Sequence, residues 1–267
     1  MSDAMLQRRL DRRRCLAGRA DTAAPDAGVD EVTEPVQGTL WPTDNAGKQL
    51  PPSLGDIEQG KVGDCYLFAA LAALLSADPK NITDMIEPGL DGAYTVTFKG
   101  LGFFFASTQL VTPDFYLEKH GRVSIGGALW PLVIEKAWAQ QQGGIGKLEE
   151  GNPALLIKAI TNRSAEQIDP RSLPAQRVLA WLAIARQKHQ PITAIGIPRG
   201  KATDAMKVVP EKIPELHFSH AYAVIDVSIE TKRVKVFNPW GLFHPNGDGW
   251  MDIESFKTFF AEVDINI

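Results

Sequence analysis

Four side chains of the types needed for acyl transfer stand at the ends of regular segments. Cys65 opens an apolar run (CYLFAALAALLS), and Gln59 stands shortly before it in QGKVGDC. His220 opens the run HAYAVIDVSI, and Asn238 ends the run RVKVFN. A thiol nucleophile, an imidazole base, a group that orients the base and an amide donor together suit covalent acyl transfer.

The run that begins at Cys65 predicts a central buried helix, because it is apolar on nearly all sides. Its entry, Gly63 and Asp64, supplies a flexible residue and a capping residue. A cysteine at a helix start lies near the positive end of the helix dipole, which lowers the thiol pKa and favours the thiolate. A free cysteine is also often a small buried hydrophobe, so position alone leaves that interpretation open.

Gln59 strengthens the catalytic interpretation of Cys65. Its side-chain amide could donate a hydrogen bond to a developing oxyanion, beside the backbone N–H of Cys65. Gly60 and Gly63 allow the chain to fold tightly enough to bring the two donors together.

His220 and Asn238 are predicted to lie on neighbouring strands. The link 230–232 is short enough for a hairpin, and Pro239 holds Asn238 in an extended conformation. Asn238 could then bind one ring nitrogen of His220 and leave the other to take the thiol proton. Trp240 would either shield this hydrogen bond from water or serve as an ordinary core tryptophan.

The chain divides by composition into three stretches. Residues 1–40 are rich in Arg, Asp, Ala and Gly and predict a flexible leader. Residues 41–169 carry mainly helical signals, with two short β runs (YTVTF and GFFFAS), and 170–267 carry mainly strands. The predicted fold class is α+β, with a helical N-terminal lobe, an antiparallel β C-terminal lobe and the active site in the cleft between them. The polar segment 199–217 predicts a loop, either on the plain surface or mobile beside the site.

Composition excludes several classes of function. The 267 residues are 44% apolar with a net charge of -4, so no general attraction to nucleic acid or acidic membranes is expected. Two cysteines, Cys15 and Cys65, cannot build a disulfide framework or a thiolate metal site, and they favour a reducing compartment. No apolar run is long enough to span a bilayer, and the N-terminus lacks the apolar region of a Sec signal. We therefore expect a cytoplasmic protein, or one secreted without a Sec-type signal.

Several motifs resemble the protease core of calpains. QGKVGDCYLFAALAAL is similar to the calpain signature around the nucleophile, SHAYAVIDV to its histidine segment, and FNPWG to its asparagine segment. LWPLVIEKAWAQ and GDGWMDIESFKTFF also resemble that core, so the similarity extends from Trp41 to Phe260. The resemblance implies a papain-like fold in two lobes and a stand-alone core with endopeptidase activity through a thioester on Cys65.

The same resemblance implies roles for individual residues. Cys65, His220, Asn238 and Gln59 would be the catalytic residues, and Trp240 would cover the histidine. Gly63 and Ser219 would line the substrate cleft together with Trp240. The expected partners are protein or peptide substrates, together with a dedicated inhibitor or immunity protein if the chain is an effector.

Calcium is a further implication of the resemblance. Asp56 and Glu135 stand where the first lobe of calpains has calcium-binding carboxylates, and Asp248 matches one in the second lobe. His244 and Asn246 occupy neighbouring positions where the family usually has other ligands, which weakens the expectation of a second site. The chemistry itself requires no cofactor, so calcium is expected, if at all, as an activator.

Two other functions are compatible with these residues. A transglutaminase-like acyltransferase or deamidase also uses a Cys–His site, although the FNPWG context favours a peptidase. A non-catalytic calpain-like module would bind a protein without cleaving it, although such modules usually lack one of the three catalytic side chains.

Overall fold

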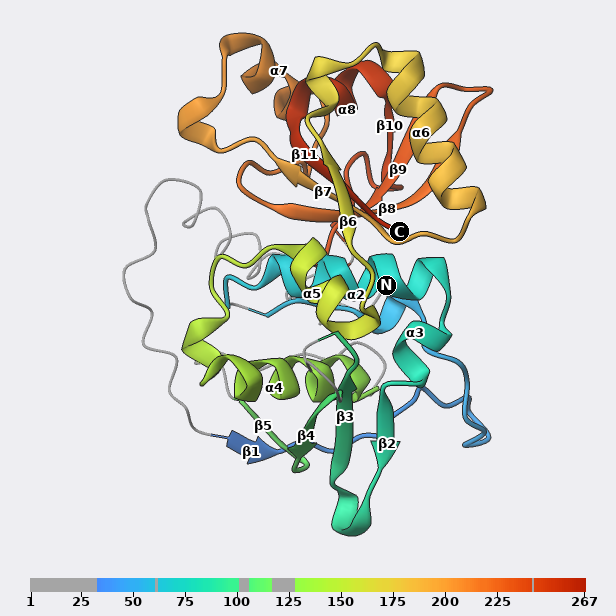
Figure 1. Ribbon diagram of the computed structural model, residues 1–267, viewed down its shortest axis with the longest axis vertical. Coiled ribbons are helices and arrows are strands. Elements are labelled where there is room, and N and C mark those ends of the chain that lie inside the picture. The colour runs from blue at the N-terminus through green and yellow to red at the C-terminus, as the bar shows by residue number, and fades with distance from the viewer. Residues whose placement is uncertain (1–32, 61, 101–105, 117–127, 242) are drawn as a thin grey trace.

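The computed structural model describes residues 33–60, 62–100, 106–116, 128–241 and 243–267 (Figure 1). These residues combine helices with antiparallel sheets. Figure 1 shows a helical unit around α2 and a sheet unit around a six-stranded sheet. The helical unit contains β1 (Thr33–Pro35), α2 (Cys65–Ala77), α3 (Lys80–Thr83), β2 (Ile86–Pro88), β3 (Tyr94–Phe98), β4 (Ser107–Val111), β5 (Asp114–Tyr116), α4 (Trp130–Gln142) and α5 (Pro153–Thr161). The sheet unit contains β6 (Ala165–Ile168), α6 (Ala175–Gln187), β7 (Ile192–Gly196), α7 (Asp204–Lys212), β8 (Ala221–Ser228), β9 (Arg233–Phe237), β10 (Trp250–Asp252), α8 (Ile253–Phe259) and β11 (Phe260–Asn266).

The helical unit is organised around α2, as its composition predicts. Almost every side chain of this helix is buried, so it packs on all sides rather than along one stripe. The neighbouring helices begin where local chemistry favours a helix start. Pro131 lies in the first turn of α4, and the Asn152 side chain accepts hydrogen bonds from the backbone of Ala154 and Leu155 at the start of α5.

The sheet unit is built on an antiparallel sheet of order β10-β9-β8-β7-β11-β6. The predicted hairpin joins β8 and β9, which pair antiparallel. Alternation along β8 divides its side chains between two cores. Tyr222 and Val224 pack with α6 and α8, whereas Ala221 and Ala223 belong to the core around α2.

Hydrogen bonds also join the two units. Arg186 Nη2 donates to the carbonyl of Ser76 at 3.0 Å, near the end of α2. At the other side, Asn152 Nδ2 donates to Glu262 Oε1 at 3.2 Å. With the packing of α2 on β8, these contacts fix the start of α2 relative to the sheet.

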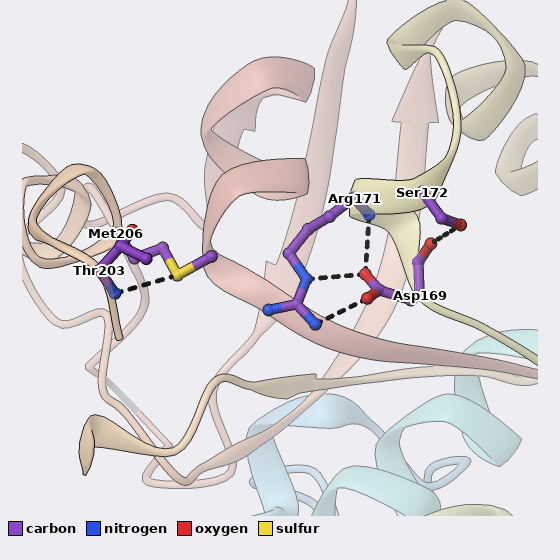
Figure 2. A network of polar contacts seen from close by, with 5 residues as sticks. All are labelled: Asp169, Arg171, Ser172, Thr203 and Met206. Atoms are coloured by element: carbon purple, nitrogen blue, oxygen red, sulfur yellow. Dashed lines mark hydrogen bonds and ion pairs between the residues drawn. The ribbon is translucent and has the colours of Figure 1, made fainter. Parts of the chain in front are cut away.

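The turn between β6 and α6 is held by a local polar network. Figure 2 shows the Asp169 carboxylate, which accepts hydrogen bonds from the backbone and the guanidinium of Arg171. The hydroxyl of Ser172 donates to the carbonyl of Asp169. This turn follows β6, which pairs with β11 at the edge of the sheet.

The structure differs from the sequence-based predictions at three segments. The stretch 199–217, predicted as a loop, contains α7, which was missed because Pro210 lies inside it and Val209 is its one buried side chain. The backbone N–H of Thr203 donates to Met206 Sδ at the start of this helix (Figure 2). Residues 33–35, assigned to the leader, form β1 and pair with β5. Most of the run GFFFAS lies outside the described residues, and the strand that pairs with β3 begins at Ser107.

No helix among the described residues has the length and apolar character needed to cross a membrane.

The stability of the fold should depend strongly on α2. Leu71 is fully buried in this helix, whereas Leu155 on α5 is 65% exposed. Leu71→Ala should lower the free energy of unfolding by about 2–5 kcal/mol, because it leaves a cavity in a packed core. The matched change Leu155→Ala should cost less than about 1 kcal/mol. Urea denaturation of both variants measures the difference, and equal losses would contradict the central role of α2.

Candidate active site

Cys65 is the first residue of α2, and its side chain is half-buried. Burial raises the pKa of its thiol to about 11, and the neighbouring Asp64 carboxylate acts in the same direction. The backbone N–H of Ala221 on β8 partly opposes this shift by hydrogen bonding to the sulfur. The prediction of a lowered thiol pKa was therefore wrong for this structure, because loss of solvent outweighs the helix dipole. Asp64 is the N-cap residue, but its side chain makes no capping hydrogen bond.

His220 is buried directly before β8, and its ring is held by Asn238. Nε2 of the imidazole lies 2.9 Å from Asn238 Oδ1. The orientation of the amide is defined, because Asn238 Nδ2 donates to the carbonyl of Phe243 at 2.6 Å. Oδ1 is therefore the acceptor, so Nε2 carries the proton and Nδ1 is left to accept another.

Aromatic rings surround the imidazole. Trp240 lies 4.4 Å from the His220 ring centroid, and Tyr222 contacts the ring edge-on at 4.8 Å. Burial lowers the pKa of His220 to about 3, and the nearby His217 also lowers it, whereas the hydrogen bond to Asn238 raises it. Both the thiol and the imidazole are therefore uncharged at neutral pH in this arrangement.

Gln59 connects the two halves of the site. Its backbone N–H donates to the carbonyl of Pro239, next to Asn238, at 2.8 Å. Its side-chain Nε2 donates to the carbonyl of Val62 at 2.8 Å, so one amide hydrogen is used to shape the loop before Cys65. The second hydrogen on Nε2 is the one that could serve an oxyanion.

The structure brings the predicted catalytic residues to one place. Cys65 meets the strand of His220 through the N–H of Ala221, and Gln59 meets the loop of Asn238 through Pro239. The described residues show no hydrogen bond between the Cys65 sulfur and the His220 ring.

The predicted cleft residues lie close to these groups along the chain. Gly63 is half-buried and its carbonyl accepts a hydrogen bond from Glu150 N. Ser219 is exposed and adopts a positive φ of 51°, directly before His220. A left-handed conformation is uncommon for serine and turns the chain sharply into β8.

The three predicted calcium ligands lie in different surroundings. Asp56 is buried, and its Oδ2 accepts hydrogen bonds from Ser53 N and Trp130 Nε1. Glu135 is buried within α4, whereas Asp248 is exposed and accepts from Trp250 N. Within the described parts of the chain, no group of three or more His, Cys, Asp or Glu side chains is placed to hold a metal ion. Calcium binding by these residues stays a prediction.

A cavity of about 370 Å³ lies between the units, behind the Asn238 loop. It is lined by Leu54 and Ile57 of the helical unit and by Phe237 and His244 of the sheet unit, with Asp248 at its side. His244 Nδ1 accepts the backbone N–H of Asn238 at 3.2 Å. Asp248 therefore lines the same cavity as His244, the residue whose ring supports Asn238.

The family model for calpain family cysteine proteases matches residues 50–257. The chain belongs to the calpain family. The match contains Gln59, Cys65, His220 and Asn238, so the residues that the structure assembles all lie in the family's region.

Relatives in the family are much longer than this chain. The calpain-type cysteine protease DEK1 of Arabidopsis thaliana is 27% identical over 82% of this chain but only 11% of its own length. The calpain-type cysteine protease ADL1 of Oryza sativa subsp. japonica is 30% identical over 69% of this chain and 9% of its own length. The calpain-2 catalytic subunit of Rattus norvegicus is 27% identical over 79% of this chain and 31% of its own length.

Sequence reasoning missed three side chains of this calpain-family site. The rings of Tyr222 and His217 lie beside the ring of His220, and His244 accepts the backbone N–H of Asn238. Tyr222 stands two residues after His220, so strand alternation places both on one face, which is the available signal for it. His217 and His244 stand in irregular segments, where no periodicity indicates the direction of a side chain.

Acid should destabilise the fold through His220. Its folded pKa of about 3 lies below the ordinary histidine value of about 6.5, so the unfolded chain binds a proton first as pH falls. The stability gained by burying His220 in its neutral form is fully present above pH 6.5. It is lost as pH falls toward 3, by up to about 1.4 kcal/mol per pH unit. His220→Gln should therefore lose less stability than the parent between pH 7 and pH 4.5. Thermal melts over that range measure this, and parallel curves for the two proteins would contradict it.

Proposed function

We propose that this chain is a cysteine endopeptidase that hydrolyses protein peptide bonds through a thioester on Cys65. The observation that carries the proposal is the hydrogen bond between His220 Nε2 and Asn238 Oδ1 at the place where α2 presents Cys65. This bond leaves Nδ1 as the one ring nitrogen that can take the thiol proton.

The reaction begins from a neutral thiol and a neutral imidazole. As the thiol approaches Nδ1, its proton passes to His220 and the thiolate attacks the peptide carbonyl. Asn238 stabilises the imidazolium through its amide oxygen. The Cys65 N–H and the second Nε2 hydrogen of Gln59 donate to the oxyanion. His220 then protonates the leaving amine, and water hydrolyses the thioester.

The proposal includes a papain-like arrangement of two lobes with the site between them. It is supported by the division of the apolar side chains into two cores, one around α2 and one behind the sheet. It is also supported by the origin of the catalytic groups, since Cys65 and Gln59 come from the helical unit and His220 and Asn238 from the sheet unit. Substrate that bridges the units could draw the thiol and imidazole together.

Protein substrates are part of the proposal. The names of the plant relatives describe cysteine proteases, and this chain covers only a fraction of their lengths. The Asp56 Oδ2 atom, a predicted calcium ligand, accepts hydrogen bonds from Ser53 N and Trp130 Nε1. No step of the proposed reaction depends on a metal ion.

Removal of the nucleophile tests the proposal directly. Cys65→Ala should lower kcat for hydrolysis of a protein or peptide library by at least about 10,000-fold, because no other group can form the thioester. Cys15→Ser is the matched control and should keep parental activity. Mass spectrometry of new N-termini, with calcium and with chelator, measures both cleavage and any ion requirement.

Other outcomes of this experiment have clear meanings. Equal cleavage by Cys65→Ala and the parent would remove Cys65 as the nucleophile. Incorporation of a labelled amine without new N-termini would identify an acyltransferase instead. A parent that neither cleaves nor reacts with an epoxysuccinyl thiol probe would identify a binding module.

Gln59 provides a test of the oxyanion assignment. Gln59→Glu keeps the size of the side chain but removes the amide donor, so kcat should fall about 100- to 1,000-fold with little change in KM. Steady-state kinetics on one cleaved peptide measures the effect. An unchanged kcat would show that Gln59 only supports the loop through Val62 and Pro239.

A further inference from the structure

A second imidazole lies beside the proposed catalytic one. The ring of His217 is 4.4 Å from Trp240 and 6.2 Å from His220, which it meets edge-on. Trp240 is itself 4.4 Å from His220, so it contacts both histidines. A change in the charge of His217 would therefore act on His220 at short range.

The position of His217 is fixed from several sides. Its backbone N–H donates to the Tyr222 hydroxyl at 2.8 Å, and Tyr222 in turn contacts the His220 ring. Two residues with positive φ, Glu215 (64°) and Ser219 (51°), lie on either side of it in the chain. Such conformations are uncommon outside glycine and persist where the surrounding structure holds them.

Glu215 and His217 form a carboxylate–imidazole pair. Glu215 Oε2 lies 3.6 Å from His217 Nε2. Burial lowers the pKa of His217, and Glu215 partly restores it. The titratable groups near the two rings are Glu215, beside His217, and Tyr222, beside His220. The Cys65 thiol in turn lies close enough to Tyr222 to affect its pKa.

We propose that His217 is a positioning residue that controls the basicity of His220 and must be uncharged for His220 to accept the Cys65 proton. The proposal rests on the proposed peptidase function, because it concerns the proton transfer that starts that reaction. A neutral His217 packs on Trp240 and leaves His220 free to become an imidazolium. A protonated His217 places a second positive charge near the ring that must become charged.

The size of this effect follows from the separation of the rings. Two positive charges 6.2 Å apart in surroundings of effective dielectric constant about 20 disfavour the doubly charged state by about 100-fold. The His217 side chain is 35% exposed, so solvent screening reduces this to about 10- to 100-fold. An ion pair between Glu215 and protonated His217 reduces this factor further.

Three replacements of His217 test the proposal by separating charge from packing. His217→Gln is neutral, His217→Phe keeps a ring, and His217→Lys carries a charge near neutral pH. At pH 7 the lysine variant should have kcat/KM about 10- to 100-fold below that of the glutamine variant. The acidic limb of its pH–kcat/KM profile should move to lower pH, because the imidazolium of His220 loses its proton more readily beside a second positive charge.

A labelling experiment measures the same proton transfer without a protein substrate. In a Cys15→Ser background, an epoxysuccinyl probe reacts with Cys65 when the thiolate forms a C–S bond and the epoxide C–O bond breaks. The resulting alkoxide takes its proton from the His220 imidazolium, so the labelling rate requires both partners. The pH dependence of labelling should rank the three variants as kcat/KM does.

The outcomes separate this proposal from the proposed function. If the parent labels but cleaves no protein, the peptidase function fails, while the variants still test His217. If the parent is active and the lysine and glutamine variants share one pH profile, His217 has a packing role only and the proposal is wrong. A parent that neither labels nor cleaves overturns both. Circular dichroism melts show that the compared variants are folded.

Discussion

The packing of α2 against β8 is the contact on which the rest of the site depends. It places the first residue of a helix from one unit beside the first residues of a strand from the other. Small side chains make this approach close, because Ala221 and Ala223 are the residues of β8 that belong to the core around α2. The backbone N–H of Ala221 can therefore reach the sulfur of Cys65. A larger side chain at either alanine would hold the nucleophile away from its base.

That close packing has an electrostatic consequence. Burial favours the uncharged forms of both Cys65 and His220, which opposes the ion pair that makes a thiol a strong nucleophile. The hydrogen bond that His220 donates to Asn238 works against this penalty, since it favours the charged imidazole. The resting site is thus uncharged, and the proposed reaction begins with transfer of the thiol proton to the imidazole. A charge on His217, which lies beside Trp240 and His220, would shift the balance between the charged and uncharged forms of His220.

Much of the fold and the site could be predicted from the sequence. Proline, asparagine and apolar periodicity mark α4, α5 and α6 locally. The segment with α7 was missed, since a polar helix with an internal proline carries neither signal. The strands β6 and β11 form part of one sheet by long-range pairing, which no local pattern specifies.

The sequence by itself determined the identity of the reactive groups. Their types, their order and their positions at the ends of regular segments follow from local chemistry, and the motifs around them identify the calpain family. Only the tertiary structure decided their protonation, because a pKa depends on what surrounds a group from distant parts of the chain. The raised thiol pKa of Cys65 reverses the expectation from the helix dipole for this reason. The ring contacts of His217 with Trp240 and His220 are likewise set by folding, since loop residues carry no periodicity that predicts where they point.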